Sequence, residues 1–167
     1  EDITVTLTPK SETRTDTVYF TWTIEAEGKA DVTGSAFVAP VDGIYTINVE
    51  DIDIGWDQDA TLTLNAYLTN SVNLQMAELD SGYWNITTPV STDMPVDVVD
   101  GRELDIMLTR YNALDGFSGE CTITLTNVDN SEDVLTATAN YDTAAHTLTF
   151  SVTPATSGTY SIAVTQP

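Results

Sequence analysis

The chain has very little of what most enzyme sites and cross-linked folds are built from. Its 167 residues include one cysteine and one histidine, so an internal disulfide is excluded. The sequence also has no glycine-rich phosphate loop and no nucleophile with a base nearby in sequence. These absences indicate a non-catalytic building or binding module rather than an enzyme.

The two rare residues themselves have ordinary interpretations. Cys121 stands in the strand pattern Cys121-Ile123-Leu125, where we expect a buried and unreactive thiol. His146 lies on the strand pattern Thr147-Leu148-Thr149-Phe150 and has no second metal ligand near it in sequence. We expect a surface or packed histidine there.

Basic residues are scarce as well. Five Lys and Arg stand against 26 Asp and Glu, which gives a formal net charge of -21. Such a surface repels phosphate backbones and anionic lipid, so we expect no nucleic-acid partner. No apolar run approaches the ~20 residues that span a bilayer, so we expect no membrane insertion. The Thr-rich, Lys-poor composition favours an extracellular, cell-surface or virion-surface location.

What the sequence has in abundance is alternation of apolar and polar residues, from Ile3 to Val164. A period of two is typical of half-buried strands, and no run of ten residues supports an amphipathic helix. Short strands separated by Gly- and Asp-containing turns indicate an all-β sandwich. The expected strands cover residues 2–8, 17–25, 32–39, 43–50, 59–68, 71–78, 83–88, 94–99, 103–110, 118–127, 133–141, 145–152 and 158–165.

One stretch recurs weakly. Residues 39–49 and 153–164 each place a proline before a Gly-x-Tyr-x-Ile-x-Val strand, which puts Tyr, Ile and Val on one face. Two explanations stay open. Any turn and strand built from β-forming residues would look alike, or residues 131–165 form a second partial unit that pairs with the first.

The first of these stretches also resembles a known family. Phe37, followed by Ala39-Pro40 and the Gly-x-Tyr-x-Ile-x-Val strand, resembles the signature of the jelly-roll superfamily of complement globular heads and tumour-necrosis-factor-like ligands. Residues 94–106 are similar to its apolar strand, acidic-glycine turn and following strand, and Phe117-Ser118-Gly119 stands where its last strand commonly opens. The resemblance covers roughly residues 17–127. It implies a jelly roll with a habit of forming trimers.

We therefore predict a jelly-roll β-sandwich with additional N- and C-terminal strands. Residues 1–16 form an N-terminal strand and tether, residues 17–128 form the jelly-roll domain, and residues 129–167 form strands that pack on or extend the same sandwich.

The N-terminal strand has two interpretations. Ile3, Val5 and Leu7 alternate cleanly, which makes this segment a candidate donor strand that completes a neighbour's sheet. The alternative is an edge strand folded back on its own domain.

The densest acidic stretch predicts a cation site. Asp51 and Asp53 point to one side of an extended strand, and Asp57 and Asp59 repeat the pattern after Gly55. Because Ca²⁺ takes 6–8 oxygen ligands, these four carboxylates are candidate calcium ligands. An acidic, solvated loop is the alternative.

Two aromatic positions predict a sugar site. Tyr83 and Trp84 are adjacent, so one of them must face away from the core. With Trp56 they form a candidate carbohydrate-binding set, since an exposed aromatic ring stacks on a sugar. The alternative is that Trp84 and Trp56 fill the ends of the sandwich or subunit interfaces. Asn85 opens an Asn-Ile-Thr glycosylation pattern.

The favoured function is a non-catalytic extracellular structural subunit that assembles with copies of itself. A trimer, a fibre, or a pilus-like or viral appendage with an adhesive role fits this class. Assembly is expected through sheet edges and through strand sides that carry Tyr19, Trp22, Tyr45 and Tyr67. The alternative is a carbohydrate-binding module with a glycan partner, and a glycan-active enzyme is less favoured.

Overall fold

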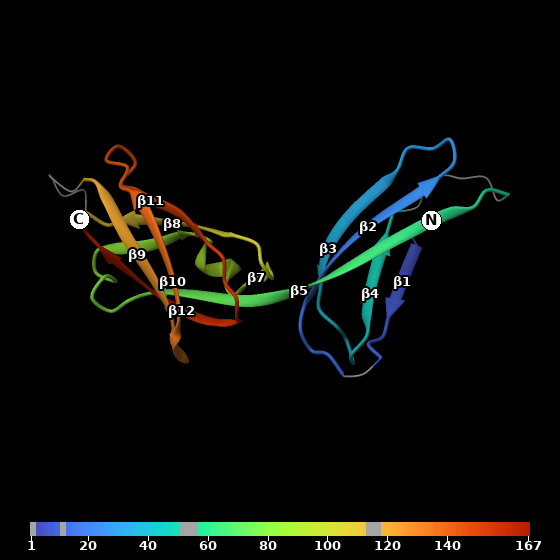
Figure 1. Ribbon diagram of the computed structural model, residues 1–167, viewed down its shortest axis with the longest axis horizontal. Helices are drawn as coiled ribbons and strands as arrows, with labels where there is room; N and C mark the ends of the chain where they lie inside the picture. The colour runs from blue at the N-terminus through green and yellow to red at the C-terminus, as the bar shows by residue number, and fades with distance from the viewer. Residues whose placement is uncertain (1–2, 11–12, 51–56, 113–117) are drawn as a thin grey trace. The chain divides into compact units, whose positions relative to one another are not determined.

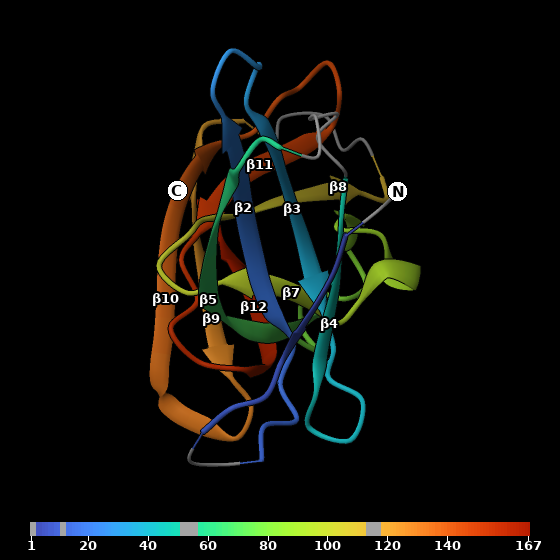
Figure 2. The same ribbon diagram turned by 90° about the vertical axis from the view of Figure 1, so that its right-hand side faces the viewer.

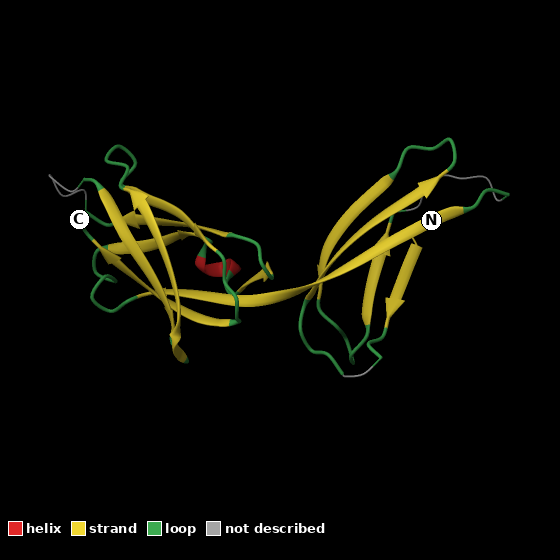
Figure 3. Ribbon diagram, viewed as in Figure 1, coloured by secondary structure: helices red, strands yellow, loops and turns green. Residues whose placement is uncertain are grey.

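The regular secondary structure of the described residues consists of strands and one short 3-10 helix, joined by loops and turns (Figure 3). The computed structural model describes residues 3–10, 13–50, 57–112 and 118–167. The all-β sandwich class is therefore confirmed. The elements are β1 (Ile3–Leu7), β2 (Val18–Ala26), β3 (Val32–Val38), β4 (Tyr45–Val49), β5 (Ala60–Met76), β6 (Trp84–Thr88), the 3-10 helix η1 (Ser91–Asp93), β7 (Val96–Val99), β8 (Leu104–Arg110), β9 (Glu120–Asn127), β10 (Asn130–Asn140), β11 (Thr147–Val152) and β12 (Gly158–Thr165).

The chain divides into two compact units, residues 1–69 and 70–167. Strand β5 contributes to both, because residues 60–68 pair antiparallel with β2 and residues 72–76 pair parallel with β12. The expected boundaries after residues 16 and 128 do not coincide with this division. We also expected two strands, 59–68 and 71–78, where the structure has one.

Side chains at the division explain why β5 is continuous. Neither Gly nor Pro interrupts residues 69–71, and the side chains of Thr69 and Asn70 both make hydrogen bonds. Thr69 Oγ1 donates to the Thr17 carbonyl at 2.6 Å, within the first unit. Asn70 Nδ2 donates to the Pro154 carbonyl at 3.2 Å, within the second. The strand therefore needs no turn where its partners change.

The first unit packs a three-stranded sheet, ordered β5–β2–β3, against the two-stranded sheet β1–β4 (Figure 1). Strands β2 and β3 run side by side in Figure 2. Every second residue of β2 faces the core, from Val18 to Ile24, and these side chains are 1–8% exposed. The core of the unit consists of Val18, Phe20, Trp22, Ile24, Tyr45, Ile47 and Val49.

The second unit packs the sheet β11–β8–β6 with the sheet ordered β10–β9–β12–β5, and β7 also pairs with β5. Cys121 is fully buried on β9, as predicted. Burial raises the pKa of its thiol, and the Arg110 charge opposes that shift. His146 is half-buried, and its Nδ1 lies 3.2 Å from the Tyr141 hydroxyl.

The weak repeat marks the same corner in each unit. The first stretch crosses from β3 to β4, and the second crosses from β11 to β12. Tyr45 and Tyr160 are 3% and 0% exposed. The Tyr45 hydroxyl donates to the Asp16 carbonyl at 2.6 Å, whereas the Tyr160 hydroxyl donates to Asp133 Oδ2 at 2.7 Å and lies 3.2 Å from the Thr156 carbonyl oxygen. The two strands do not pair with each other, since β4 pairs with β1 and β12 with β9 and β5.

A polar cluster completes the corner of the second unit. Asp133 Oδ2 accepts hydrogen bonds from the Thr156 hydroxyl at 2.5 Å, the Tyr160 hydroxyl at 2.7 Å and Asn127 Nδ2 at 3.1 Å. These bonds lower the pKa of Asp133 from its usual 3.8, with Thr156 the largest cause. Three donors on one carboxylate join β9, β10, β12 and the corner before β12.

Asp133 should therefore contribute to the acid dependence of stability. Because its folded pKa is depressed, its contribution is present above the unfolded value of 3.8 and is lost as pH falls below it. We expect Asp133→Asn to flatten the acid limb of the unfolding free energy, measured by urea denaturation from about pH 6 to pH 2. Asp97→Asn, an exposed site on β7, is the control. Identical acid limbs in Asp133→Asn and the wild type would contradict this role.

Gly34 should be needed for the packing of Trp22. The two residues are cross-strand partners, and a Cβ at position 34 would lie 2.5 Å from the Trp22 Cε2 and Cζ2 atoms. We expect Gly34→Ala to lower the unfolding free energy by about 1–3 kcal/mol. Gly82→Ala, where no atom lies within 4 Å of the added carbon, should change it by less than about 0.5 kcal/mol. Denaturant melts followed by tryptophan fluorescence measure both, and equal effects would argue against the packing role.

Candidate functional site

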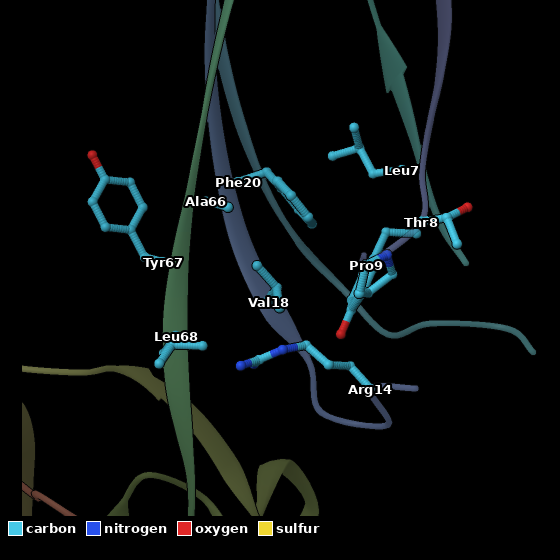
Figure 4. Close-up of a pocket in the computed structure, with 10 residues that line it drawn as sticks. Leu7, Thr8, Pro9, Arg14, Val18, Phe20, Ala66, Tyr67 and Leu68 are labelled. Carbon is cyan, nitrogen blue, oxygen red and sulfur yellow. The ribbon is translucent and has the colours of Figure 1, made fainter. Parts of the chain in front are cut away.

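A groove of about 250 Å³ runs along the first unit, between β1 and β5 (Figure 4). Residues 7–9 lie on one side and residues 66–68 on the other, with Val18 and Phe20 of β2 between them. The ring of Tyr67 points away from the other side chains, so its backbone contributes to the wall (Figure 4). The groove is mostly apolar and backed by the core.

The groove exists because one sheet is narrower than the other. Strands β1 and β4 cover β2, whose inward side chains are buried, but they leave the same face of β5 open. Leu68 is 56% exposed and Leu62 is 37% exposed, although their partners Val18 and Ile24 are 6% and 1% exposed. Apolar surface left in water costs about 25 cal/mol per Å². A contiguous patch of this kind is typical of an interaction site.

One end of the groove carries charge. Arg14 is one of the chain's five basic residues, and its side chain extends toward Leu68 (Figure 4). Burial raises the pKa of Tyr45 above its usual value, the Arg14 charge lowers it, and the Asp16 charge raises it further. The Tyr45 hydroxyl therefore stays protonated near neutral pH and acts as the hydrogen-bond donor to Asp16.

Strand β1 supplies the second element of the site. Its five residues pair with β4, from Ile3 opposite Val49 to Leu7 opposite Tyr45. Within the described residues, β1 pairs with no other strand. An edge strand presents a row of backbone N–H and C=O groups that another strand can use. The groove and the edge together can accept one extended segment, about 4.8 Å from β1.

No protein-family model and no curated protein matches the chain. A solved structure described as "Crystal structure of tetra-tandem repeat in extending region of large adhesion protein" is similar over the whole chain, with 11% sequence identity and a TM-score of 0.27. The chain spans 49% of that structure's length. A TM-score this low does not establish a shared fold. The jelly-roll resemblance stays a prediction.

The predicted assembly strand lies at this site. Ile3 is 39% exposed, whereas Val5 and Leu7 are half-buried against the core of the first unit. The strand pairs with β4 of its own chain, which is the arrangement of an edge strand folded back on its own domain. Its free edge, rather than the whole strand, is what remains to be covered.

Only part of the predicted calcium site lies within the described residues. Asp51, Asp53 and the predicted sugar-binding Trp56 lie outside the described residues. Asp57 and Asp59 are exposed. The part of the chain that the structure describes contains no group of three or more His, Cys, Asp or Glu placed to hold a metal. Calcium binding stays a prediction, as does any glycan contact of Trp56.

Tyr83 and Trp84, both predicted to bind sugar, lie in different environments. Tyr83 is 54% exposed, but Trp84 is 2% exposed. The Trp84 ring packs edge-on against Tyr141 at 5.8 Å, and the Arg110 guanidinium lies 5.3 Å from its centre. Trp84 as a sugar-stacking residue was therefore wrong, because β6 begins with this residue facing inward. Asn85, the glycosylation candidate, is exposed on β6.

Within the described residues, no helix is long and apolar enough to cross a membrane.

The groove itself was not found by sequence reasoning. Alternation at Leu62, Leu64, Ala66 and Leu68 indicates which side of β5 faces inward, but it does not indicate whether a second sheet covers that side.

We expect Trp84→Ala to destabilise the second unit by about 3–5 kcal/mol, since it removes a large buried aromatic side chain. Tyr83→Ala, at the neighbouring exposed position, should have a much smaller effect. Denaturant melts followed by circular dichroism measure both. If Trp84→Ala is as stable as Tyr83→Ala, the packing role of Trp84 is refuted.

Proposed function

We propose that the chain is a non-catalytic structural module of a secreted or surface-displayed protein and that it joins a second copy of itself through β1. The observation that supports this most directly is the uncovered apolar side of β5 beside the free edge of β1. One added strand satisfies both at once, because it pairs with the β1 backbone and covers the β5 side chains.

The second unit buries the inward side chains of its sheets, with Ile106 and Leu125 at 0% exposure. In the described part of the first unit, two strands face three, and part of β5 is left open. In the described part of that unit, the inner side of β5 carries its most exposed inward-facing leucine, Leu68.

The strand best suited to this place is β1 of the second copy. Two β1 strands that pair antiparallel about a two-fold axis form a self-complementary contact. The result is a four-stranded sheet ordered β4–β1–β1–β4. Val5 and Leu7 keep their contacts with the core of their own copy, and the exposed Ala66 and Leu68 of each copy lie beside the joined edges. In this arrangement, β1 takes part in assembly while it stays paired with β4 of its own chain.

The expected association is modest. Full burial of a leucine stabilises by about 1.5–3 kcal/mol, and each groove offers partly exposed leucines. Association also costs several kcal/mol of lost translational and rotational freedom. We therefore expect association at micromolar to millimolar concentrations. With a net charge of -21 on each copy, added salt should strengthen it by screening repulsion.

An adhesive role belongs to the same proposal. When such an acidic module associates with copies of itself, its outer faces remain available to bind a surface. Carbohydrate binding is the second candidate function, and exposed aromatic side chains on the outer face of the first unit support it.

Leu68→Lys tests the association. The position is 56% exposed, so a lysine there should leave the fold intact while placing a charge in the groove. We expect the wild type to show a concentration-dependent dimer by light scattering and sedimentation, strongest at about 0.5 M salt, and Leu68→Lys to stay monomeric. Leu79→Lys, which is 88% exposed in the second unit, is the matched control.

Two outcomes would reject the proposal. One is a wild type that stays monomeric up to about 1 mM chain at high salt. The other is an oligomer that Leu68→Lys leaves unchanged.

A further inference from the structure

The outer face of the first unit carries a row of three aromatic side chains. Tyr19 of β2 pairs with Phe37 of β3 on one side and with Tyr67 of β5 on the other. These rings face away from the core because their neighbours on β2, Val18 and Phe20, face into it. The ring centres of Tyr19 and Phe37 are 4.7 Å apart, and those of Tyr19 and Tyr67 are 6.2 Å apart.

This row is partly open to solvent. Phe37 is 49% exposed and Tyr67 is 40% exposed. Cross-strand aromatic pairs stabilise a sheet, which accounts for the ring contacts but not for large aromatic surfaces left in water. The sequence predicted that Tyr19, Trp22, Tyr45 and Tyr67 lie on strand surfaces used for assembly. Trp22 and Tyr45 are core residues instead, and Tyr19 and Tyr67 belong to the outer face.

The rows beside the aromatic one are neutral and polar. The same register places hydroxyl and amide side chains in line across the three strands, two residues further along each, or about 6.6 Å. The next row consists of Ser35, Thr21 and Asn65, and the row after it of Thr33, Thr23 and Thr63. Neither row contains a charged residue, on a chain with 26 acidic ones.

We propose that this outer face, the row Phe37–Tyr19–Tyr67 with its two polar rows, binds a neutral polysaccharide chain. The aromatic rings stack on the apolar faces of sugar rings, and the hydroxyl and amide groups exchange hydrogen bonds with the sugar hydroxyls. The inference rests on the adhesive part of the proposed function and is independent of the association through β1.

Charge and composition favour this ligand over others. The net charge of -21 repels polyanions, including acidic polysaccharides and nucleic acid. A protein partner would need an apolar centre surrounded by a rim, whereas polar rows directly adjoin the aromatic row on this face. A glycan instead presents alternating apolar faces and hydroxyls along its length.

The experiment is affinity electrophoresis of the full chain in gels that contain hydroxyethyl cellulose, xyloglucan, galactomannan or, as the anionic comparison, alginate. We expect retardation by at least one of the three neutral polymers and none by alginate. Phe37→Ala and Tyr67→Ala should each weaken that retardation about tenfold, and Phe37→Trp should retain it. Tyr111→Ala, at a residue that is 59% exposed in the second unit, is the matched control and should bind as the wild type does.

Further variants separate this inference from the proposed association. Leu68→Lys lies on the opposite side of β5 and should keep the polysaccharide binding even as a monomer, whereas Phe37→Ala should keep the wild-type oligomeric state. No retardation by any neutral polymer would overturn the inference, as would binding that Phe37→Ala and Tyr67→Ala leave intact. Binding lost in Tyr83→Ala alone would also overturn it, because the glycan site would then lie at Tyr83, as the sequence predicted. Loss of the dimer in Phe37→Ala would assign this face to protein contact instead.

Discussion

The apolar inner face of a β-sheet is stable only when other side chains cover it. The two units differ in how completely their inner faces are covered. In the second unit the strands of both sheets bury one another's apolar side chains, down to fully buried residues such as Ile106, Leu125 and Tyr160. In the first unit, β2 is equally well buried, but β5 is not. Because the two-stranded sheet ends at β1, Leu62 and Leu68 of β5 remain exposed and the β1 backbone has a free edge.

A strand alternates its side chains, so β5 presents two different surfaces from the same residues. Leu68 and Ala66 face the groove, while Tyr67 and Asn65 face the other way. The groove suits an added strand because backbone pairing and apolar burial coincide there. The outer face suits a flat, neutral, hydroxyl-rich ligand because its aromatic and polar rows are in register. Because the side chains of the two surfaces are different residues, the proposed association and the proposed glycan binding can be tested by separate substitutions.

Much of the strand layout could be predicted from the sequence, because alternation and turn residues act locally. The Tyr45 and Tyr160 corners were visible as a repeat for the same reason. Features that depend on distant partners could not be predicted. The polar run at residues 69–71 looked like a strand break until its partners, Thr17 and Pro154, were known. Adjacent aromatics at 83 and 84 required one to face outward, but the sequence did not indicate that it was Tyr83. Coverage of β5 depends on the width of the opposite sheet, which no local pattern encodes.

In the proposed dimer, the free edge of β1 is covered by a second copy. Hydrogen exchange of the backbone amides of residues 3–7, measured across a range of chain concentrations, tests it most directly. Some of these amides already pair with β4, and the others face the free edge. We expect protection of the free-edge amides to rise with chain concentration in the wild type and not in Leu68→Lys. Protection in β1 that is the same at every concentration would contradict it.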